Sequence, residues 1–248
     1  MSKVILITGA SRGIGRSAAI LAGARGWSVG VNYASNARAA DETVAAVKAA
    51  GGDAIAIAGD VRDEAAITAM FDATEQAFGK LDGVVNNAGI VAPGAALADM
   101  DIERLRRIFD TNVLGAYLCA REAARRLSRA RGGNGGSLVN VSSAAARLGA
   151  PNEYVDYAGS KGAIDVLTIG LSKELGPHGV RVNAVRPGLI ETDIHASGGK
   201  PDRAQVLGAQ TPLGRPGLAD EVAESIVWLL SDASSYVTGA LLDVTGGR

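Results

Sequence analysis

Tyr157 and Lys161 are the side chains in this sequence whose spacing points most directly to acid–base chemistry. They lie four residues apart in a segment whose pattern predicts a helix, so both project from one helix face. A phenol with a pKa near ~10 is a poor base at neutral pH. An ammonium group about 4 Å away could lower that pKa by up to ~3 units before screening losses. We therefore expect Tyr157 to exchange a proton near physiological pH.

Two further polar groups can be placed near this pair. Ser142 and Ser143 end a predicted strand shortly before the helix, where a hydroxyl could hydrogen-bond the same substrate oxygen. Asn112 is an amide within the apolar frame DTNVLGAY, in a helix that we expect to be buried. Because buried amides need hydrogen-bond partners, a structural role explains Asn112 as well as a catalytic one does.

The stretch Thr8-Gly9-Ala10-Ser11-Arg12-Gly13-Ile14-Gly15 follows the apolar run VILI near the start of the chain. A strand that leads through glycines into a helix presents backbone N–H groups and a positive helix end to an anion. The three glycines would allow a tight turn, close approach of a phosphate and packing of helix on strand. A plain strand–helix turn would show the same glycines, so this loop alone does not establish a phosphate site.

The end of the second predicted strand favours NADP over NAD. NAD sites commonly place an Asp or Glu there for the ribose hydroxyls, whereas this strand ends in Asn32-Tyr33-Ala34-Ser35-Asn36, without a carboxylate. Asn32, Ser35 and Asn36 could donate hydrogen bonds to a 2′-phosphate. Arg12 or Arg38 could supply positive charge, although both could equally be solvated surface cations.

Short β-branched runs alternate with Ala-rich stretches of helical length along the whole chain. This pattern predicts an α/β fold: a doubly wound Rossmann-type sheet of about seven parallel strands with helices on both faces. No composition shift divides residues 1–248, so we expect a single domain for dinucleotide binding and catalysis. Residues 190–213 break the alternation just after a strand end and are expected to form a substrate lid.

Composition narrows the function further. The 248 residues are 47% hydrophobic and carry a formal net charge of -1, which gives no general attraction to nucleic acid or to an acidic membrane surface. The single cysteine, Cys119, cannot form an internal disulfide and fits a reducing compartment. With no leader or membrane-spanning run, we expect a cytoplasmic protein that acts on a small molecule and holds no metal.

Taken together, these motifs resemble those of the short-chain dehydrogenase/reductase family over the whole chain and in the expected order. The resemblance includes the glycine loop, Asn112, Ser143, Tyr157 and Lys161. It also includes Asp60-Val61 after the third strand, Asn86-Asn87-Ala88-Gly89 after the fourth, and Pro187-Gly188 followed by Ile190 and Thr192.

The resemblance implies a role for each matching residue. Tyr157 would give a proton in carbonyl reduction and take one in alcohol oxidation, Ser143 would polarise the carbonyl, and Lys161 would lower the phenol pKa while binding the nicotinamide ribose. Asn112 would hold a water linked to Lys161. The implied cofactor contacts are Gly9, Ser11, Arg12, Gly13, Ile14, Gly15, Asn32, Tyr33, Ser35, Asp60, Val61, Asn87, Ala88, Gly89, Tyr157, Lys161, Pro187, Gly188, Ile190 and Thr192.

One departure from the family pattern and one rival function leave alternatives open. Similar sequences place the serine thirteen residues before the tyrosine, whereas Ser143 stands fourteen and Ser142 fifteen residues before Tyr157. Ser142 therefore remains an alternative to Ser143. A dinucleotide-binding sensor without turnover is a rival function, but such proteins typically lose the tyrosine or the lysine, and this chain has both.

The substrate is much less clear from the sequence. Similar frameworks serve 3-oxoacyl-carrier-protein reductases, glucose 1-dehydrogenase-like sugar dehydrogenases and general ketone reductases, and residues 91–94, Asn152, Glu153, Tyr154 and His195 could line the pocket. An arginine-rich helix could dock an acidic acyl-carrier protein or simply be a solvated helix end. The resemblance also implies a homotetramer that packs the Asn112 and Tyr157 helices across one interface. The arginines are Arg121, Arg125, Arg126, Arg129 and Arg131.

Overall fold

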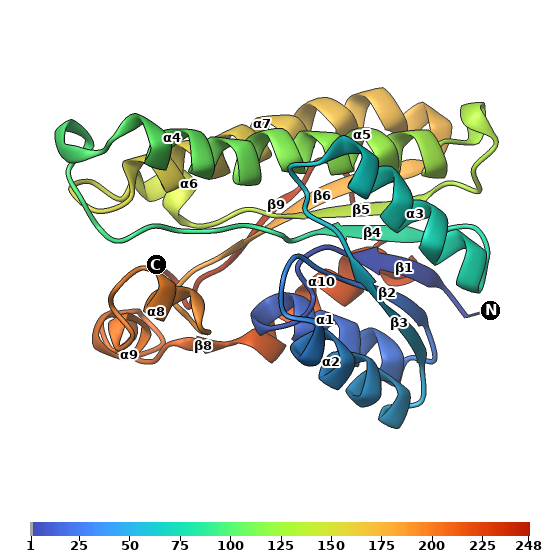
Figure 1. Cartoon of the computed structure of the whole chain (residues 1–248), viewed down its shortest axis with the longest axis horizontal. Helices are drawn as coiled ribbons and strands as arrows, with labels where there is room; N and C mark the ends of the chain where they lie inside the picture. Colours follow the sequence, from blue (N-terminus) through green and yellow to red (C-terminus); the bar gives the residue numbers. More distant parts are fainter. Residues whose placement is uncertain (1) are drawn as a thin grey trace.

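The short apolar runs of the sequence form one seven-stranded sheet in the computed structural model of the chain, which describes residues 2–248 (Figure 1). The strand order is β3-β2-β1-β4-β5-β6-β9, and every neighbouring pair is parallel. The predicted fold class is therefore confirmed. The strands are β1 (Val4–Ile7), β2 (Ser28–Tyr33), β3 (Asp53–Ala58), β4 (Gly83–Asn86), β5 (Gly136–Val141), β6 (Val180–Pro187) and β9 (Leu241–Val244).

Helices cover both faces of this sheet, as right-handed crossovers between parallel strands require. In Figure 1, α1, α2 and α10 lie on one face, and α3, α4, α5 and α7 lie on the other. The helices are α1 (Gly13–Ala24), α2 (Ala37–Ala49), α3 (Glu64–Phe78), α4 (Ile102–Phe109), α5 (Ala116–Leu127), α6 (Ala145–Leu148), α7 (Val155–Leu175) and α10 (Ala219–Leu230).

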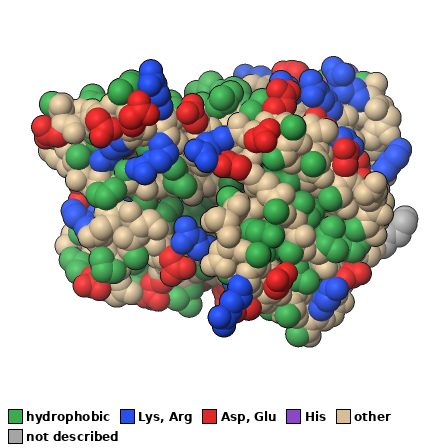
Figure 2. Space-filling view, viewed as in Figure 1, with side chains coloured by type: hydrophobic (Ala, Val, Ile, Leu, Met, Phe, Trp, Pro, Cys, Tyr) green, Lys and Arg blue, Asp and Glu red, His purple; other side chains and the backbone are tan. Residues whose placement is uncertain are grey.

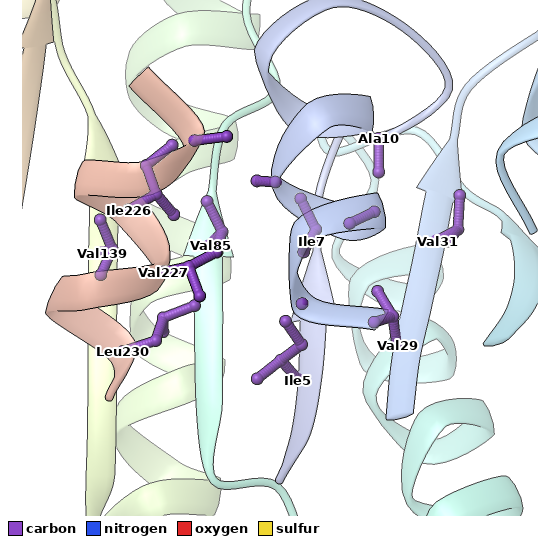
Figure 3. Packing of buried hydrophobic residues seen from close by; sticks show 14 of the residues in the cluster. Ile5, Ile7, Ala10, Val29, Val31, Val85, Val139, Ile226, Val227 and Leu230 are labelled. Carbon is purple, nitrogen blue, oxygen red and sulfur yellow. The ribbon is translucent and has the colours of Figure 1, made fainter. Parts of the chain in front are cut away.

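Alternation along the strands divides the core into two layers. On β1, Ile5 and Ile7 pack into the cluster beneath α1 and α10, while Val4 and Leu6 pack into the cluster beneath α3 and α5. Figure 3 shows the first layer, where Ile226 of α10 lies over the strands. Both faces of the sheet are buried because successive strand residues point to opposite sides.

Cys119 lies in the second layer and is fully buried. Burial raises the pKa of its thiol to about 12. A thiol that stays protonated and out of solvent is unreactive, so Cys119 is a packing residue.

The strand order reverses between β1 and β4, and this reversal creates a crevice at their carboxyl ends. The hydroxyl of Thr8 holds the crevice together: it accepts hydrogen bonds from the N–H groups of Asn87, at 2.9 Å, and Ala88, at 3.0 Å. The loop after β1 is thereby joined to the loop after β4.

The segment expected to form a lid contains short elements of its own beyond the carboxyl ends of the strands, at the end of the molecule away from the N-terminus (Figure 1). Its first strand pairs with β8, so the ordered excursion extends a few residues beyond the expected end at 213. These elements are β7 (Ile190–Glu191), α8 (Ile194–Ser197), α9 (Arg203–Gly208) and β8 (Gly217–Leu218).

The helix that contains Asn112 is not regular along its length. Residues Asp110–Gly115 form a π-helical turn between α4 and α5, and α5 ends at Leu127. A short 3-10 turn, Arg129–Arg131, follows. In residues 2–248, no helix has both the length and the apolar character needed to cross a bilayer.

The packing of α10 on the sheet can be tested with Ile226→Ala, because Ile226 is fully buried. We expect the free energy of unfolding to fall by about 2–5 kcal/mol through lost burial and a residual cavity. Ile102→Ala is the matched control, since that side chain is 57% exposed, and it should change stability by no more than ~0.5 kcal/mol. Urea unfolding at equal protein concentration measures both, and equal losses would contradict this packing.

Candidate active site

A cavity of about 960 Å³ lies beyond the carboxyl ends of the strands. Its walls come from the glycine loop, the loops after β2, β3 and β4, the end of β5, the first turns of α7 and the lid. Figure 2 shows a hollow near the middle of this face, between the lid and the helices of the opposite layer. One continuous space therefore joins the glycine loop to the Tyr157 helix.

Lys161 lies in this cavity one helical turn after Tyr157. Its ammonium group donates a 2.7 Å hydrogen bond to the carbonyl of Val141, at the end of β5. The Nζ atom lies over the Tyr157 ring, 5.7 Å from the ring centroid. Burial lowers the pKa of Lys161 to about 8, and the Asp165 carboxylate partly opposes this shift. Lys161 therefore remains mostly protonated at neutral pH.

The phenol of Tyr157 behaves differently from the sequence expectation. Burial raises its pKa above the ordinary value, and a hydrogen bond with Ser143 acts in the opposite direction. The expected lowering of this pKa by Lys161 is not found, because the ammonium lies over the ring and is bound to Val141. Tyr157 therefore carries its proton at neutral pH.

The two serines at the end of β5 have different surroundings. Ser143 lies close enough to the Tyr157 hydroxyl to lower its pKa, and it accepts a 3.1 Å hydrogen bond from the N–H of Ala145. Ser142 is buried and donates a 3.1 Å hydrogen bond to the backbone carbonyl of Lys161. Ser143 thus faces the tyrosine, while Ser142 attaches β5 to α7.

Asn112 lies inside the π-helical turn and is buried. Its amide donates to the carbonyl of Ile90 at 2.9 Å and to the hydroxyl of Ser160 at 3.2 Å, and its oxygen accepts from the N–H of Ile90 at 2.8 Å. A Cβ atom added at Gly89 would lie 3.4 Å from both the Asn112 amide oxygen and Lys161 Nζ. Asn112 therefore fixes the loop after β4 beside Lys161. π-helical turns often occur at functional sites, but apolar periodicity does not reveal them.

The glycine loop has the shape that an anion site requires. Gly9 and Gly13 have φ values of +63° and +55°, which favour glycine. Gly15 does not line the cavity; a Cβ atom there would lie 2.5 Å from the Asn87 amide nitrogen, so its role is close packing. Helix α1 begins at Gly13, and no side chain caps its first turn at Arg12. This helix end faces the cavity and fits the pyrophosphate of a dinucleotide.

Asn32 and Tyr33, both expected to touch the cofactor, are placed differently. The Asn32 amide accepts from the N–H of Gly9 at 3.1 Å and donates to the carbonyl of Gly59 at 3.0 Å. Asn32 borders the cavity, but its amide holds the surrounding loops, so the expected bond to a phosphate is corrected to a structural one. Tyr33 packs against the core and does not line the cavity, because successive strand residues face opposite sides.

The glycine loop and the loop after β2 add a charged side chain and two polar side chains to the cavity wall. Arg12 is exposed, lines the cavity and has no ion pair within the described part of the chain. Ser35 and Asn36 also line the cavity, although the Asn36 side chain caps α2 by accepting from the N–H of Ala39 at 3.1 Å. Arg38 lies outside the cavity lining and pairs with Glu42 at 2.9 Å.

The other expected cofactor residues form the middle of the cavity wall. The Asp60 carboxylate binds Arg62 at 2.6 Å, and this hydrogen bond lowers the pKa of Asp60 despite partial burial. The Asn87 amide donates to the carbonyls of Thr8, at 2.8 Å, and Gly9, at 3.0 Å. The residues of this group that line the cavity are Ser11, Ile14, Asp60, Val61, Asn87, Ala88, Gly89, Pro187, Gly188, Ile190 and Thr192.

The lid end of the cavity carries charged side chains. Glu153 binds Lys200 and Arg203, each at 2.6 Å, and Arg203 also lies over the ring of Tyr154. Burial would raise the pKa of Glu153, but these hydrogen bonds outweigh it and lower the pKa. Arg203 lines the cavity and was not predicted, although its place in the expected lid was a signal.

Some of the other residues expected around the substrate line the cavity, and the others do not. Tyr154 donates a 3.3 Å hydrogen bond to the carbonyl of Gly198, and His195 Nε2 lies 2.9 Å from the carbonyl of Ile190; both residues line the cavity with Val91. Burial lowers the pKa of His195. Asn152 is exposed and, like residues 92–94, is not part of the lining.

The arginine-rich helix makes ion pairs within the chain. Arg126 binds Asp72, Glu75 and Glu122 at 2.6–2.7 Å. Arg121 pairs with Glu64, and Arg125 pairs with Glu122. Much of this positive charge is therefore used to hold α5 against α3, which favours the solvated-helix interpretation over a docking site.

Comparison with known proteins gives consistent matches. Residues 9–248 match a family model described as enoyl-(acyl carrier protein) reductase. An uncharacterized oxidoreductase of Escherichia coli strain K12 is 50% identical over 99% of both chains. L-rhamnose 1-dehydrogenase (NAD(P)(+)) of Sphingomonas sp. strain SKA58 is 41% identical over 99% of this chain and 95% of its own.

Solved structures agree with these sequence matches. A short-chain type dehydrogenase/reductase from Mycobacterium marinum matches with a TM-score of 0.92 and 36% identity, over 99% of this chain and 94% of that chain. The 3-ketoacyl-(acyl-carrier-protein) reductase from Brucella melitensis, in complex with NADH, matches with a TM-score of 0.91 and 33% identity, over 99% and 98%. At these identities the likeness extends beyond the fold.

Proposed function

The chain belongs to the short-chain dehydrogenase/reductase family and is an NAD(P)-dependent oxidoreductase, and we propose that it uses NADP(H) to interconvert a ketone and a secondary alcohol. One observation carries the proposal. Ser143, Tyr157 and Lys161 line the same cavity as the uncapped N-terminus of α1, so a dinucleotide on that helix can extend to the tyrosine.

In this proposal the bound dinucleotide supplies or takes up the hydride at the substrate carbon. Ser143 orients the substrate oxygen beside Tyr157, and Tyr157 gives that oxygen a proton during reduction or removes one during oxidation. Because burial raises the pKa of Tyr157, the residue begins as a proton donor. The Lys161 ammonium stabilises the buried phenolate that remains after the proton has left.

Asn112 supports the same site from the loop after β4. Both N–H groups of its amide are bound by protein, and its oxygen accepts from Ile90. A water linked to Lys161 could therefore bind Asn112 only by donating a further hydrogen bond to the amide oxygen. We therefore assign Asn112 chiefly to holding residues 89–90 against Lys161.

Two substrate classes remain, and the lid end of the cavity decides between them. The apolar part of the wall, with Val91, Leu148 and Ile194, suits a ketone such as a 3-oxoacyl thioester. A sugar dehydrogenase is the second candidate, since Glu153, Arg203 and His195 could bind hydroxyl groups and one relative is named as a rhamnose dehydrogenase.

A panel of substrates followed by Tyr157→Phe tests the proposed reaction. NADPH oxidation is measured with 3-oxoacyl thioesters and simple ketones, and NADP reduction is measured with aldoses. With the best substrate, Tyr157→Phe should lower kcat at least ~100-fold because the proton donor is lost. Tyr236→Phe is the matched control and should keep most of the activity, since this side chain is fully exposed and lies outside the cavity lining. Near wild-type turnover by Tyr157→Phe would refute the mechanism, and turnover of aldoses alone would favour the sugar dehydrogenase.

The preference for NADP rests on Arg12. Its guanidinium lines the cavity without a carboxylate partner in the described chain, and the end of β2 offers no acidic side chain to repel a phosphate. A guanidinium recognises phosphate through paired, charge-assisted hydrogen bonds. Ser35, on the same part of the wall, can add a hydroxyl donor.

Arg12→Ala should therefore raise the KM for NADPH by ~10–100-fold, the loss expected for hydrogen bonds to a charged group. The KM for NADH should change little, because NADH lacks the 2′-phosphate. Arg38→Ala is the matched control, since Arg38 already pairs with Glu42 outside the cavity. If the KM rises equally for NADPH and NADH, Arg12 does not recognise the 2′-phosphate and is a solvated surface charge.

An apolar surface supports the proposal of a homotetramer. It lies on the outer face of α4, α5 and α7 and the π-helical turn, where large side chains are 39–67% exposed. Glycines of α7 leave open space beside them. Patches of this kind mark contacts between subunits. The surface consists of Phe109, Leu114, Tyr117, Gly159, Gly162, Val166, Ile169 and Gly170.

Sedimentation equilibrium should give a mass about four times the 25.1 kDa of the chain. Val166→Glu should shift the enzyme toward smaller species, because a charge would be buried at the contact. Val206→Glu is the control: this side chain is similarly exposed but belongs to the lid. A monomer at micromolar concentration would contradict the proposed assembly.

A further inference from the structure

Arg104 joins two segments that border the active site, although it does not line the cavity itself. It lies in α4, and its side chain is only 12% exposed. Its guanidinium donates to the two carboxylate oxygens of Asp156, from Nε at 2.8 Å and from Nη2 at 3.3 Å. The third contact runs from Nη1 to the carbonyl of Pro93 at 2.5 Å.

The first segment is the turn that carries the proton donor. Asp156 immediately precedes Tyr157 in the first turn of α7, and its side chain is 1% exposed. Its Oδ1 atom accepts a 2.9 Å hydrogen bond from the backbone N–H of Tyr157. The guanidinium of Arg104 therefore acts on the backbone of Tyr157 through one carboxylate.

The second segment is the loop after β4, residues 89–95, which forms part of the cavity wall. Asn112 holds one end at Ile90, and the N–H of Ala95 bonds the carbonyl of Glu153 at 3.0 Å at the other end. Pro93 lies between these two points. Its carbonyl is held by Arg104, so the loop is attached to the same guanidinium as Asp156.

The chemistry of arginine suits this double attachment. A guanidinium is planar, and its donors point in fixed directions, so binding to Asp156 determines where Nη1 points. A lysine ammonium could pair with Asp156, but its single nitrogen cannot span both acceptors. The arrangement therefore sets the distance between the wall of the substrate cavity and the turn that bears Tyr157.

We propose that Arg104 is a positioning residue for proton transfer, which holds Tyr157 and the loop of residues 89–95 in one fixed relation through Asp156 and Pro93. This inference rests on the proposed function, because it concerns the proton that Tyr157 gives to the substrate. Displacement of a reacting group by about 1 Å can lower the rate ~100-fold without any change in the group itself.

Four variants separate positioning from stability. Arg104→Met removes both attachments, and Arg104→Lys retains the charge and one of them. The double variant Arg104→Met with Asp156→Asn also removes the buried charge that would otherwise be left without a partner. Arg106→Met is the matched control, since Arg106 of the same helix pairs with Glu103 at an exposed site.

Each variant is assayed at a temperature where circular dichroism shows it to be folded. The readouts are kcat and KM for the best carbonyl substrate, the Kd of NADPH from fluorescence titration, and hydrogen exchange of the amides in residues 89–95. We expect Arg104→Met to lower kcat by about 10–100-fold. Its Kd for NADPH should stay within about twofold of wild type, because no contact of Arg104 reaches the glycine loop.

Amide exchange at Ile90 and Ala95 should become faster in Arg104→Met. Arg104→Lys should recover part of kcat, and the double variant should recover thermal stability without recovering kcat. The proposal is overturned if Arg104→Met keeps the kcat of Arg106→Met, or if the double variant restores kcat along with stability. Tyr157→Phe is assayed in parallel: retained turnover there would instead refute the proposed function.

Discussion

Two amide side chains hold the backbone of Gly9 between them, and the cavity depends on this arrangement. Asn32 accepts from the N–H of Gly9, and Asn87 donates to its carbonyl. The first amide comes from the end of β2 and the second from the loop after β4, so the glycine loop is attached on both sides of β1. Amide side chains whose hydrogen-bond partners lie inside the protein are held rigidly. The N-terminus of α1 therefore has a set direction at the point where the strand order reverses.

A second junction positions the catalytic half of the cavity. Lys161 bonds the carbonyl of Val141, and Ser142 returns a bond to the carbonyl of Lys161, so β5 and α7 are tied by both side chain and backbone. Burial of this junction shifts the pKa values of Tyr157 and Lys161. It raises the pKa of Tyr157 and lowers that of Lys161 to about 8, which moves the two values apart. A proton held on the phenol and a cation beside it are the starting state that the proposed carbonyl reduction needs.

The substrate end of the cavity is built on different contacts. The lid is held chiefly by Glu153, through ion pairs with Lys200 and Arg203, and by the hydroxyl of Tyr154. The two ion pairs lie at partly exposed side chains and are weaker than the amide hydrogen bonds around Gly9. The cavity thus combines a glycine-loop half held by amide hydrogen bonds with an end held by a few polar contacts of residues 153, 154, 198, 200 and 203.

The sequence by itself determined the succession of strands and helices along the chain, the glycine loop and the pair Tyr157 and Lys161. These features depend on local periodicity and on spacing within one element. It could not decide which way buried side chains point. Asn32 proved to hold loops together, Tyr33 to pack in the core, and Lys161 to bind Val141. Only the tertiary structure brought Arg104 to Asp156 and Pro93 and raised the pKa of Tyr157, since contacts between distant segments and the loss of water on burial exist only after the chain has folded.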